Sequence, residues 1–137
     1  DVSENMVKHC REEKGMNERQ SDFREIKSWL GRGRLLWAHF SLIHVPLANF
    51  PAQLRDVCNL CIDDGIVGIG FKTGDDEERI DPAGEESLDV DRFTVFHRPQ
   101  SMRSRLEEVG LNWITTVERQ SHEDSYTYCW LPARKPE

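Results

Sequence analysis

The segment from residue 35 to residue 72 constrains the fold more than any other part of the sequence. Its middle, residues 51–65, has apolar side chains at the spacing of one face of a helix. These side chains are Leu54, Val57, Cys58, Cys61 and Ile62. A run rich in aromatic and β-branched residues, LLWAHFSLIHV (35–45), precedes this helix, and IVGIGFK (66–72) follows it. The segment therefore predicts a strand–helix–strand unit.

The remaining elements are predicted from shorter patterns. SDFREIKSWL (21–30) has helical spacing, RFTVFH (92–97) predicts a strand, and residues 99–110 predict a helix. Residues 112–119 and 125–131 alternate with a period of two, which predicts a hairpin. The alternation predicts that Tyr126, Tyr128 and Trp130 share one face. This order of elements excludes all-α and all-β folds.

The sequence therefore predicts an α+β fold with a small mixed or antiparallel sheet flanked by two or three helices. Three architectures fit: a ferredoxin-like sheet with an added hairpin strand, a small partly closed barrel, and a winged helix made from the last helix and hairpin. With 137 residues the chain suits one core. We expect a flexible or loosely helical arm at 1–20, one domain at 21–131, and a loose tail at 132–137.

The net charge of −7 is concentrated in one segment. Residues 74–92 hold nine acids against Arg79 and Arg92, which is −7, and the rest of the chain has 16 acids and 16 bases. We expect this segment to be a mobile acidic loop. The folded body is then neutral, so the acidity does not argue against a nucleic-acid partner.

The expected location of the protein is the cytoplasm or nucleus. No apolar run approaches the roughly 20 residues of a membrane helix, so we expect no membrane partner. The start of the sequence lacks the apolar core of a signal peptide. Cys10, Cys58, Cys61 and Cys129 are expected to be reduced, since a core of this size does not need disulfides.

Candidate catalytic and metal sites are weak. His39, His44, Cys58 and Cys61 could bind zinc, but both cysteines lie on the apolar stripe and the histidines are five residues apart, so a core role is favoured. Cys10 and Cys129 have no recognisable motif around them. We therefore expect no catalytic residue, no metal and no cofactor, and a protein that is not an enzyme.

Two groups of residues could bind a ligand. Arg98, Arg103 and Arg105 surround the start of the helix at 99–110, where they could contact phosphates, or form an ordinary solvated face balanced by nearby glutamates. Aromatic residues beside a glycine-lined strand could sandwich a flat base, although such rings also commonly form a core. The predicted ligand-binding residues are Trp37, Gly68, Gly70, Phe71, Arg98, Arg103, Arg105 and Trp113.

The run LLWAHFSLIHV, then a helix, then GIVGIGF resembles the opening of PUA/EVE-like domains. NWITTVER followed by YTYCWL resembles their later paired strands, whereas the long acidic segment and the region after Phe96 depart from them. The resemblance implies a PUA-like barrel that binds RNA or modified bases, with Trp37, Gly68, Gly70, Phe71 and Trp113 near the pocket.

The functional prediction from the sequence is a non-catalytic recognition domain that binds a nucleic acid or a nucleobase. The alternative is a protein–protein interaction or regulatory module that acts through the acidic loop or the amphipathic N-terminal helix. An enzyme with an unfamiliar site is a third possibility, since a site can be assembled from distant residues.

Overall fold

The computed structural model describes residues 3–21, 33–81, 91–121 and 127–137. The chain divides into two compact units, Asp1–Gly31 and Arg32–Glu137, and each is described by itself. The predicted boundary between residues 20 and 21 falls inside the first unit. Nearly all of the helix predicted at 21–30 lies outside the described residues, as does the second half of the acidic segment.

The first unit contains helix α1 (Glu4–Lys14). The Ser3 hydroxyl caps its start by accepting a hydrogen bond from the Met6 amide at 3.3 Å. Gly15 ends it in the left-handed conformation, with φ of +63°. The arm predicted at residues 1–20 therefore contains a capped helix.

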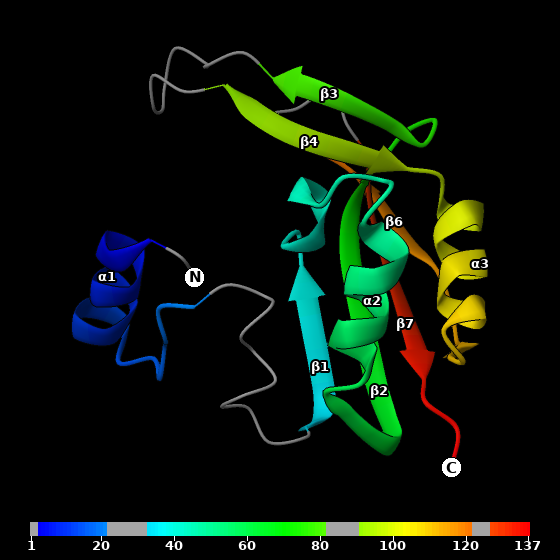
Figure 1. Ribbon diagram of the computed structural model, residues 1–137, viewed down its shortest axis with the longest axis horizontal. Helices are drawn as coiled ribbons and strands as arrows, with labels where there is room; N and C mark the ends of the chain where they lie inside the picture. The colour runs from blue at the N-terminus through cyan, green and yellow to red at the C-terminus, as the bar shows by residue number, and fades with distance from the viewer. Residues whose placement is uncertain (1–2, 22–32, 82–90, 122–126) are drawn as a thin grey trace. The chain divides into compact units, whose positions relative to one another are not determined.

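In the residues that the structure describes, the second unit has seven strands, two helices and one 3-10 turn (Figure 1). The elements are β1 (Gly33–His39), η2 (Leu42–His44), α2 (Phe50–Cys58), β2 (Cys61–Thr73), β3 (Glu77–Asp81), β4 (Arg92–His97), α3 (Pro99–Glu108), β5 (Asn112–Trp113), β6 (Val117–Gln120) and β7 (Thr127–Arg134). The seven strands form one sheet in the order β3-β4-β2-β7-β5, with β1 also paired to β2 and β6 paired to β7.

Strand β2 organises this sheet. It pairs in parallel with β1 and with β4, and antiparallel with β7. A parallel pair needs a long crossover, and α2 supplies it between β1 and β2. The sheet is mixed and open, with parallel strands at its centre. The predicted ferredoxin-like sheet, PUA-like barrel and winged helix are therefore wrong, although the strand–helix–strand unit is confirmed.

Three element boundaries differ from the prediction. Helix α2 ends at Cys58, and Cys61 and Ile62 belong to β2 instead. Part of the acidic segment forms β3, because it pairs antiparallel with β4. Strand β7 continues into the predicted tail as far as Arg134, because the buried side chain of Ala133 lies opposite Val67 in the centre of the sheet.

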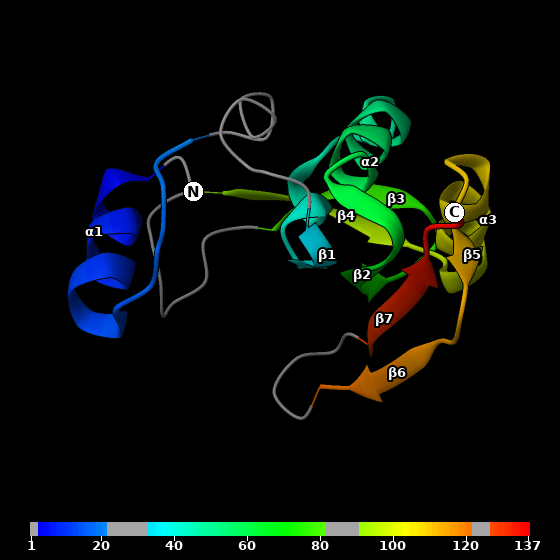
Figure 2. The ribbon, with the colours of Figure 1, turned by 90° about the horizontal axis from the view of Figure 1, so that it is seen from below.

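The two faces of the sheet differ. Helices α2 and α3 lie on one side (Figure 2), which we call the covered face. Buried side chains fill the core there: Phe50, Leu54, Val67, Ile69, Phe71, Met102, Leu106, Cys129 and Leu131. The opposite side, the open face, presents Trp37, His39, Gly68, Gly70, Tyr128 and Trp130, as the strand registers require. No described helix of the second unit covers the open face, where Trp37 remains 52% exposed.

Gly65 lies where β2 departs from regular pairing with β1. A Cβ atom at this position would lie 2.5 Å from Cys61 Sγ, 2.8 Å from the Ile62 carbonyl oxygen and 2.9 Å from the Arg34 carbonyl oxygen. Because two of these atoms are backbone, we expect Gly65→Ala to reduce the free energy of unfolding by about 1–3 kcal/mol. Urea denaturation measures this loss.

Gly33→Ala is the matched control for this substitution. The nearest atom to a Cβ at Gly33 is the Leu35 carbonyl oxygen, at an ordinary 3.4 Å. We expect Gly33→Ala to change stability by no more than about 0.5 kcal/mol. Equal losses for the two variants would contradict the steric argument.

Candidate functional site

The carboxyl end of β1 turns sharply at Phe40. This residue has a φ of +51°, in the left-handed region that is uncommon for residues other than glycine. Its amide donates a hydrogen bond to the Gly70 carbonyl oxygen at 3.0 Å, so the turn is held against β2. In an open sheet that contains parallel strands, ligands bind beyond the carboxyl ends of those strands, and the turn at Phe40 therefore marks the candidate site.

His39 and Trp130 form a flat surface at this end of the open face. Their rings are inclined by only 10°, with centroids 6.0 Å apart. Trp130 Nε1 donates a hydrogen bond to His39 Nδ1 at 3.1 Å, and an indole N–H points outward in the plane of its ring. The two rings are therefore joined edge to edge and are nearly coplanar. We call this pair the aromatic platform.

Gly70 lies directly beneath the aromatic platform. A Cβ atom at Gly70 would lie 3.0 Å from Trp130 Nε1 and 3.1 Å from His39 Nδ1, the two atoms that join the rings. The absence of a side chain at this position lets both rings rest on the β2 backbone. His39 is exposed and Trp130 is half-buried.

Two further rings border the aromatic platform. The Phe40 ring is tilted by 45° to His39 and by 49° to Trp130, with centroid distances of 4.2 Å and 6.0 Å. The Tyr128 ring lies 5.0 Å from Phe40 and 6.4 Å from Trp130. Strand β1, the turn that follows it and strand β7 therefore bring four rings together on the open face.

His44 follows β1 in the turn η2 and has a defined tautomer. Its Nδ1 lies 2.7 Å from the Phe93 carbonyl oxygen. A carbonyl oxygen can only accept, so Nδ1 carries the proton, and Nε2 of the neutral ring has a lone pair. In His39 the assignment is reversed, because Nδ1 accepts from Trp130. His44 is therefore able to take a proton at Nε2, whereas neutral His39 donates there.

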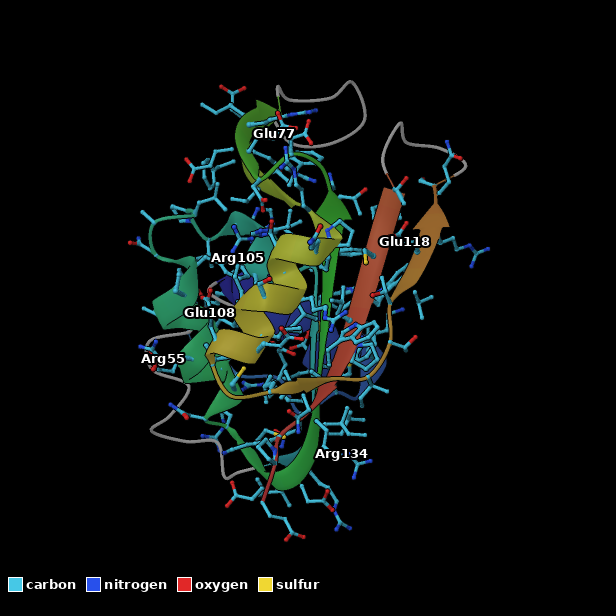
Figure 3. The ribbon with its side chains drawn as sticks, turned by 90° about the vertical axis from the view of Figure 1, so that its right-hand side faces the viewer. Arg55, Glu77, Arg105, Glu108, Glu118 and Arg134 are labelled. Carbon is cyan, nitrogen blue, oxygen red and sulfur yellow. The ribbon has the colours of Figure 1, made fainter. Side chains whose placement is uncertain are left out.

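The β3–β4 hairpin is fixed over the segment that follows β1. Besides the bond from His44 to Phe93, the Leu47 amide donates to Glu78 Oε1 at 2.7 Å. At the base of the hairpin, Arg105 Nη1 lies 2.9 Å from Asp76 Oδ1. In Figure 3, Arg105 lies on the side of α3 that faces α2. These contacts give the hairpin a fixed position beside the candidate site.

Asp76 and His97 form the polar centre of this base. Burial raises the pKa of Asp76, but hydrogen bonds from Ser101 and Arg105 outweigh it and hold the pKa below its usual value. His97 is fully buried, and its Nδ1 accepts a hydrogen bond from Arg105 at 2.8 Å. Burial, followed by the charge of Arg105, lowers the pKa of His97 to about 4, so the ring is neutral at pH 7.

The residues predicted to bind a ligand lie in three places: the open face, the covered face and the surroundings of α3. Trp37, Gly68 and Gly70 lie together on the open face, where the Trp37 ring covers Gly68. Phe71 points to the covered face and is 1% exposed. Trp113 also lies on the covered face, opposite buried Ala133.

The three predicted arginines all contact acidic side chains. Arg98 pairs with Asp75 at 3.3 Å. Arg103 pairs with Glu107 at 2.9 Å and lies 4.1 Å from the Trp113 ring, and Arg105 pairs with Asp76. The positive charge of this group is therefore largely balanced by nearby acids.

Sequence reasoning missed Phe40, and it assessed His39 and His44 only as metal ligands. It placed Tyr128 and Trp130 on one face correctly, from their alternation along β7. The left-handed turn at Phe40 leaves no pattern in the sequence. His39 and Trp130 are 91 residues apart, so no local spacing relates them.

The three cysteines of the second unit are not placed for nucleophilic chemistry. Cys58 and Cys129 are buried, and burial raises the pKa of each thiol to about 12. Burial also raises the pKa of Cys61. Within the described ranges, no group of three or more His, Cys, Asp or Glu side chains could hold a metal ion.

Comparison with known proteins relates the chain to others through structure. No family model matches the sequence, and no curated protein matches it. Among solved structures, a methyltransferase from Listeria monocytogenes that depends on S-adenosylmethionine aligns with a TM-score of 0.73 at 12% identity, over 100% of this chain and 78% of that one. The 1,6-didemethyltoxoflavin-N1-methyltransferase of Burkholderia thailandensis aligns at 0.69 and 14% identity, over 87% of this chain and 50% of that one.

These alignments establish the fold. The second unit has the Rossmann-like architecture of methyltransferases that use S-adenosylmethionine, and the chain spans between half and three fifths of the length of several of them. The [4+2]-cyclase SpnF has the same fold, with a TM-score of 0.67 and 15% identity. The fold therefore does not by itself fix the reaction.

The structural likeness overturns the resemblance to PUA/EVE-like domains, because these similar structures are methyltransferases. The prediction of a non-catalytic domain that recognises nucleic acid is wrong for the same reason, as is its alternative, a regulatory or protein-interaction module. From the sequence alone, the glycines of β2 suggested a strand that a ligand approaches, but they lie under Trp37, His39 and Trp130.

In the part of the chain that the structure describes, no helix is long and apolar enough to cross a membrane.

Proposed function

We propose that this chain takes part in methyl transfer from S-adenosylmethionine and that the methyl acceptor binds at the carboxyl end of β1. The observation that carries the proposal is the alignment of the whole chain with a methyltransferase at a TM-score of 0.73. The site beyond β1 supports it, because ligands in such sheets bind at this end. The proposal is that the chain is an enzyme or part of one.

His44 has the role of proton acceptor in this proposal. An oxygen or nitrogen acceptor that gains a methyl group loses a proton, so a base near the acceptor speeds the reaction. The hydrogen bond from Nδ1 to the Phe93 carbonyl leaves Nε2 of His44 with a lone pair. His39 is a positioning residue for the acceptor and not the base, because the lone pair of its Nδ1 already accepts a hydrogen bond from Trp130.

The carboxylates that follow β2 do not fit the role of holding the ribose of S-adenosylmethionine. A ribose in a doubly wound fold is usually held by a carboxylate near the strand ends. Here the carboxylates after β2 already have partners: Asp75 with Arg98, Asp76 with Arg105, Glu77 with Arg79 and Glu78 with the Leu47 amide. None of these four carboxylates is therefore assigned to the ribose, and no step of the reaction is assigned to the donor.

The test uses the full chain with S-adenosylmethionine labelled in its methyl group and a panel of phenol, amine and heteroaromatic acceptors. We expect label to appear in one acceptor class and S-adenosylhomocysteine to bind in calorimetric titration. His44→Gln should slow transfer by about 100-fold or more, the usual effect of losing a base. Part of the rate should return at high pH.

His9→Gln provides the control, because His9 is an exposed histidine of the first unit that pairs with Glu13. It should leave the transfer rate unchanged. If no acceptor gains label and S-adenosylhomocysteine does not bind, the proposal is overturned. Equal rates for His44→Gln and the parent chain would remove His44 from it.

A further inference from the structure

The aromatic platform of His39 and Trp130 has the geometry of a stacking surface. Its two rings are 10° apart in orientation and joined through an in-plane hydrogen bond of 3.1 Å. Together they make a flat area larger than either ring, and Gly70 supports the junction from beneath. The other side of the platform is not filled by the described core, because His39 is exposed and Trp130 only half-buried.

The bordering rings restrict what can occupy this surface. The Phe40 ring lies against part of one face of His39, because their centroids are only 4.2 Å apart at a tilt of 45°. Tyr128 is tilted by 51° to Trp130, so the surface left for a ligand is centred on Trp130 and the outer part of His39. Apolar ring faces favour a flat partner through stacking. Neutral His39 also presents Nε2–H at its outer edge, which suits an acceptor atom in the plane of such a ligand.

We propose that the aromatic platform binds a planar, uncharged aromatic or heteroaromatic ring system and that this ring system is the methyl acceptor. The identification as acceptor rests on the function proposed above, while the binding site itself rests only on the ring geometry. His39 and Trp130 stack against the ligand, and Gly70 keeps them coplanar. The platform adjoins the segment that holds His44, because Phe40 follows His39 directly and η2 begins at Leu42.

The test is a titration of the full chain, labelled with ¹⁵N, with quinoline-3-carboxamide and no methyl donor. The chain has four tryptophans, so single Trp→Phe variants assign the indole N–H signals. We expect a saturable shift of the Trp130 signal. Decahydronaphthalene-2-carboxamide, a saturated analogue, should bind at least tenfold more weakly, because it cannot stack.

Two variants locate the site. His39→Ala removes half of the platform from the exposed edge of β1, and it should weaken binding at least tenfold. Trp37→Ala removes a neighbouring exposed indole that rests on Gly68, and it should change binding by less than twofold. Folding of both variants is checked by the dispersion of the remaining amide signals.

The possible outcomes distinguish this inference from the proposed function. A Trp130 shift that is absent, or equal for the saturated analogue, overturns the aromatic site. So does a loss of binding in Trp37→Ala but not in His39→Ala. If the ring system binds but the chain transfers no methyl group, the aromatic binding site is supported and its role as the acceptor site is contradicted. If the chain transfers methyl groups but the ring system does not bind, the proposed enzymatic function is supported and the aromatic platform as a binding site is contradicted.

Discussion

Replacing Phe50 with alanine is expected to reduce the free energy of unfolding by about 3–5 kcal/mol. Phe50 is fully buried at the start of α2. Its ring lies 4.6 Å from that of His97, and the Arg105 guanidinium lies 5.7 Å from it. The side chain therefore joins α2, β4 and α3 at the end of the core nearest the candidate site. Urea or thermal denaturation measures the loss.

Leu35→Ala serves as the control for Phe50→Ala. Leu35 is also a large apolar residue, but it lies on the open face and is 66% exposed. We expect its removal to change stability by no more than about 0.5 kcal/mol. A loss at Leu35 as large as that at Phe50 would mean that the open face is part of a packed interior in solution.

The local elements of this fold could be predicted from the sequence because they depend on nearby residues. The apolar stripe of Leu54, Val57 and Cys58 identifies α2, and the β-branched residues around it identify β1 and β2. Alternation along β7 correctly places Tyr128 and Trp130 together. These predictions need only the periods of a helix and a strand.

The direction of pairing could not be predicted in the same way. Strand β2 is parallel to β1 and antiparallel to β7, and nothing within IVGIGFK distinguishes those partners. The same sequence of strands and helices suits a ferredoxin-like sheet, a barrel or an open mixed sheet. The fold prediction was wrong at this step, where the contacts join residues far apart in the chain.

The candidate site also depends on distant contacts. Trp113 and Trp130 both belong to the predicted hairpin, yet the register places Trp113 opposite Ala133 on the covered face and Trp130 opposite Gly70 on the open face. The acidic segment looked like a loop because of its charge. Arg79 on β3 covers the buried Phe96 ring, 4.5 Å from its centroid, a contact that composition does not reveal.

The structure does not test which partners the protein has or where it is located. A nucleic-acid or protein partner stays a prediction, as does a location in the cytoplasm or nucleus.

His97 combines complete burial with an unfilled hydrogen-bonding position. Its Nδ1 accepts from Arg105, so the proton of the neutral ring is on Nε2. That nitrogen is buried and has no hydrogen-bond partner among the described residues. Phe50 and Phe71 face the ring, and the Asp76 carboxylate lies 3.9 Å from Nδ1. Protonation would place a second charge beside Arg105 in an apolar environment, which explains the pKa of about 4.

This pKa makes stability depend on pH in a defined window. Between about pH 6.5 and pH 4 the unfolded chain binds a proton at His97 and the folded chain does not, so acid favours unfolding. The gap of about 2.5 pKa units corresponds to about 3 kcal/mol, lost as the pH falls from 7 to 4. His97→Gln removes the titrating group, and its stability should fall less over that range by about this amount. Asp76, whose pKa is lowered, loses its contribution only at still lower pH, so the two effects are separable by urea denaturation at a series of pH values. If the two proteins lose the same stability between pH 7 and 4, His97 has the same pKa in the folded and unfolded chains, and its burial does not control this dependence.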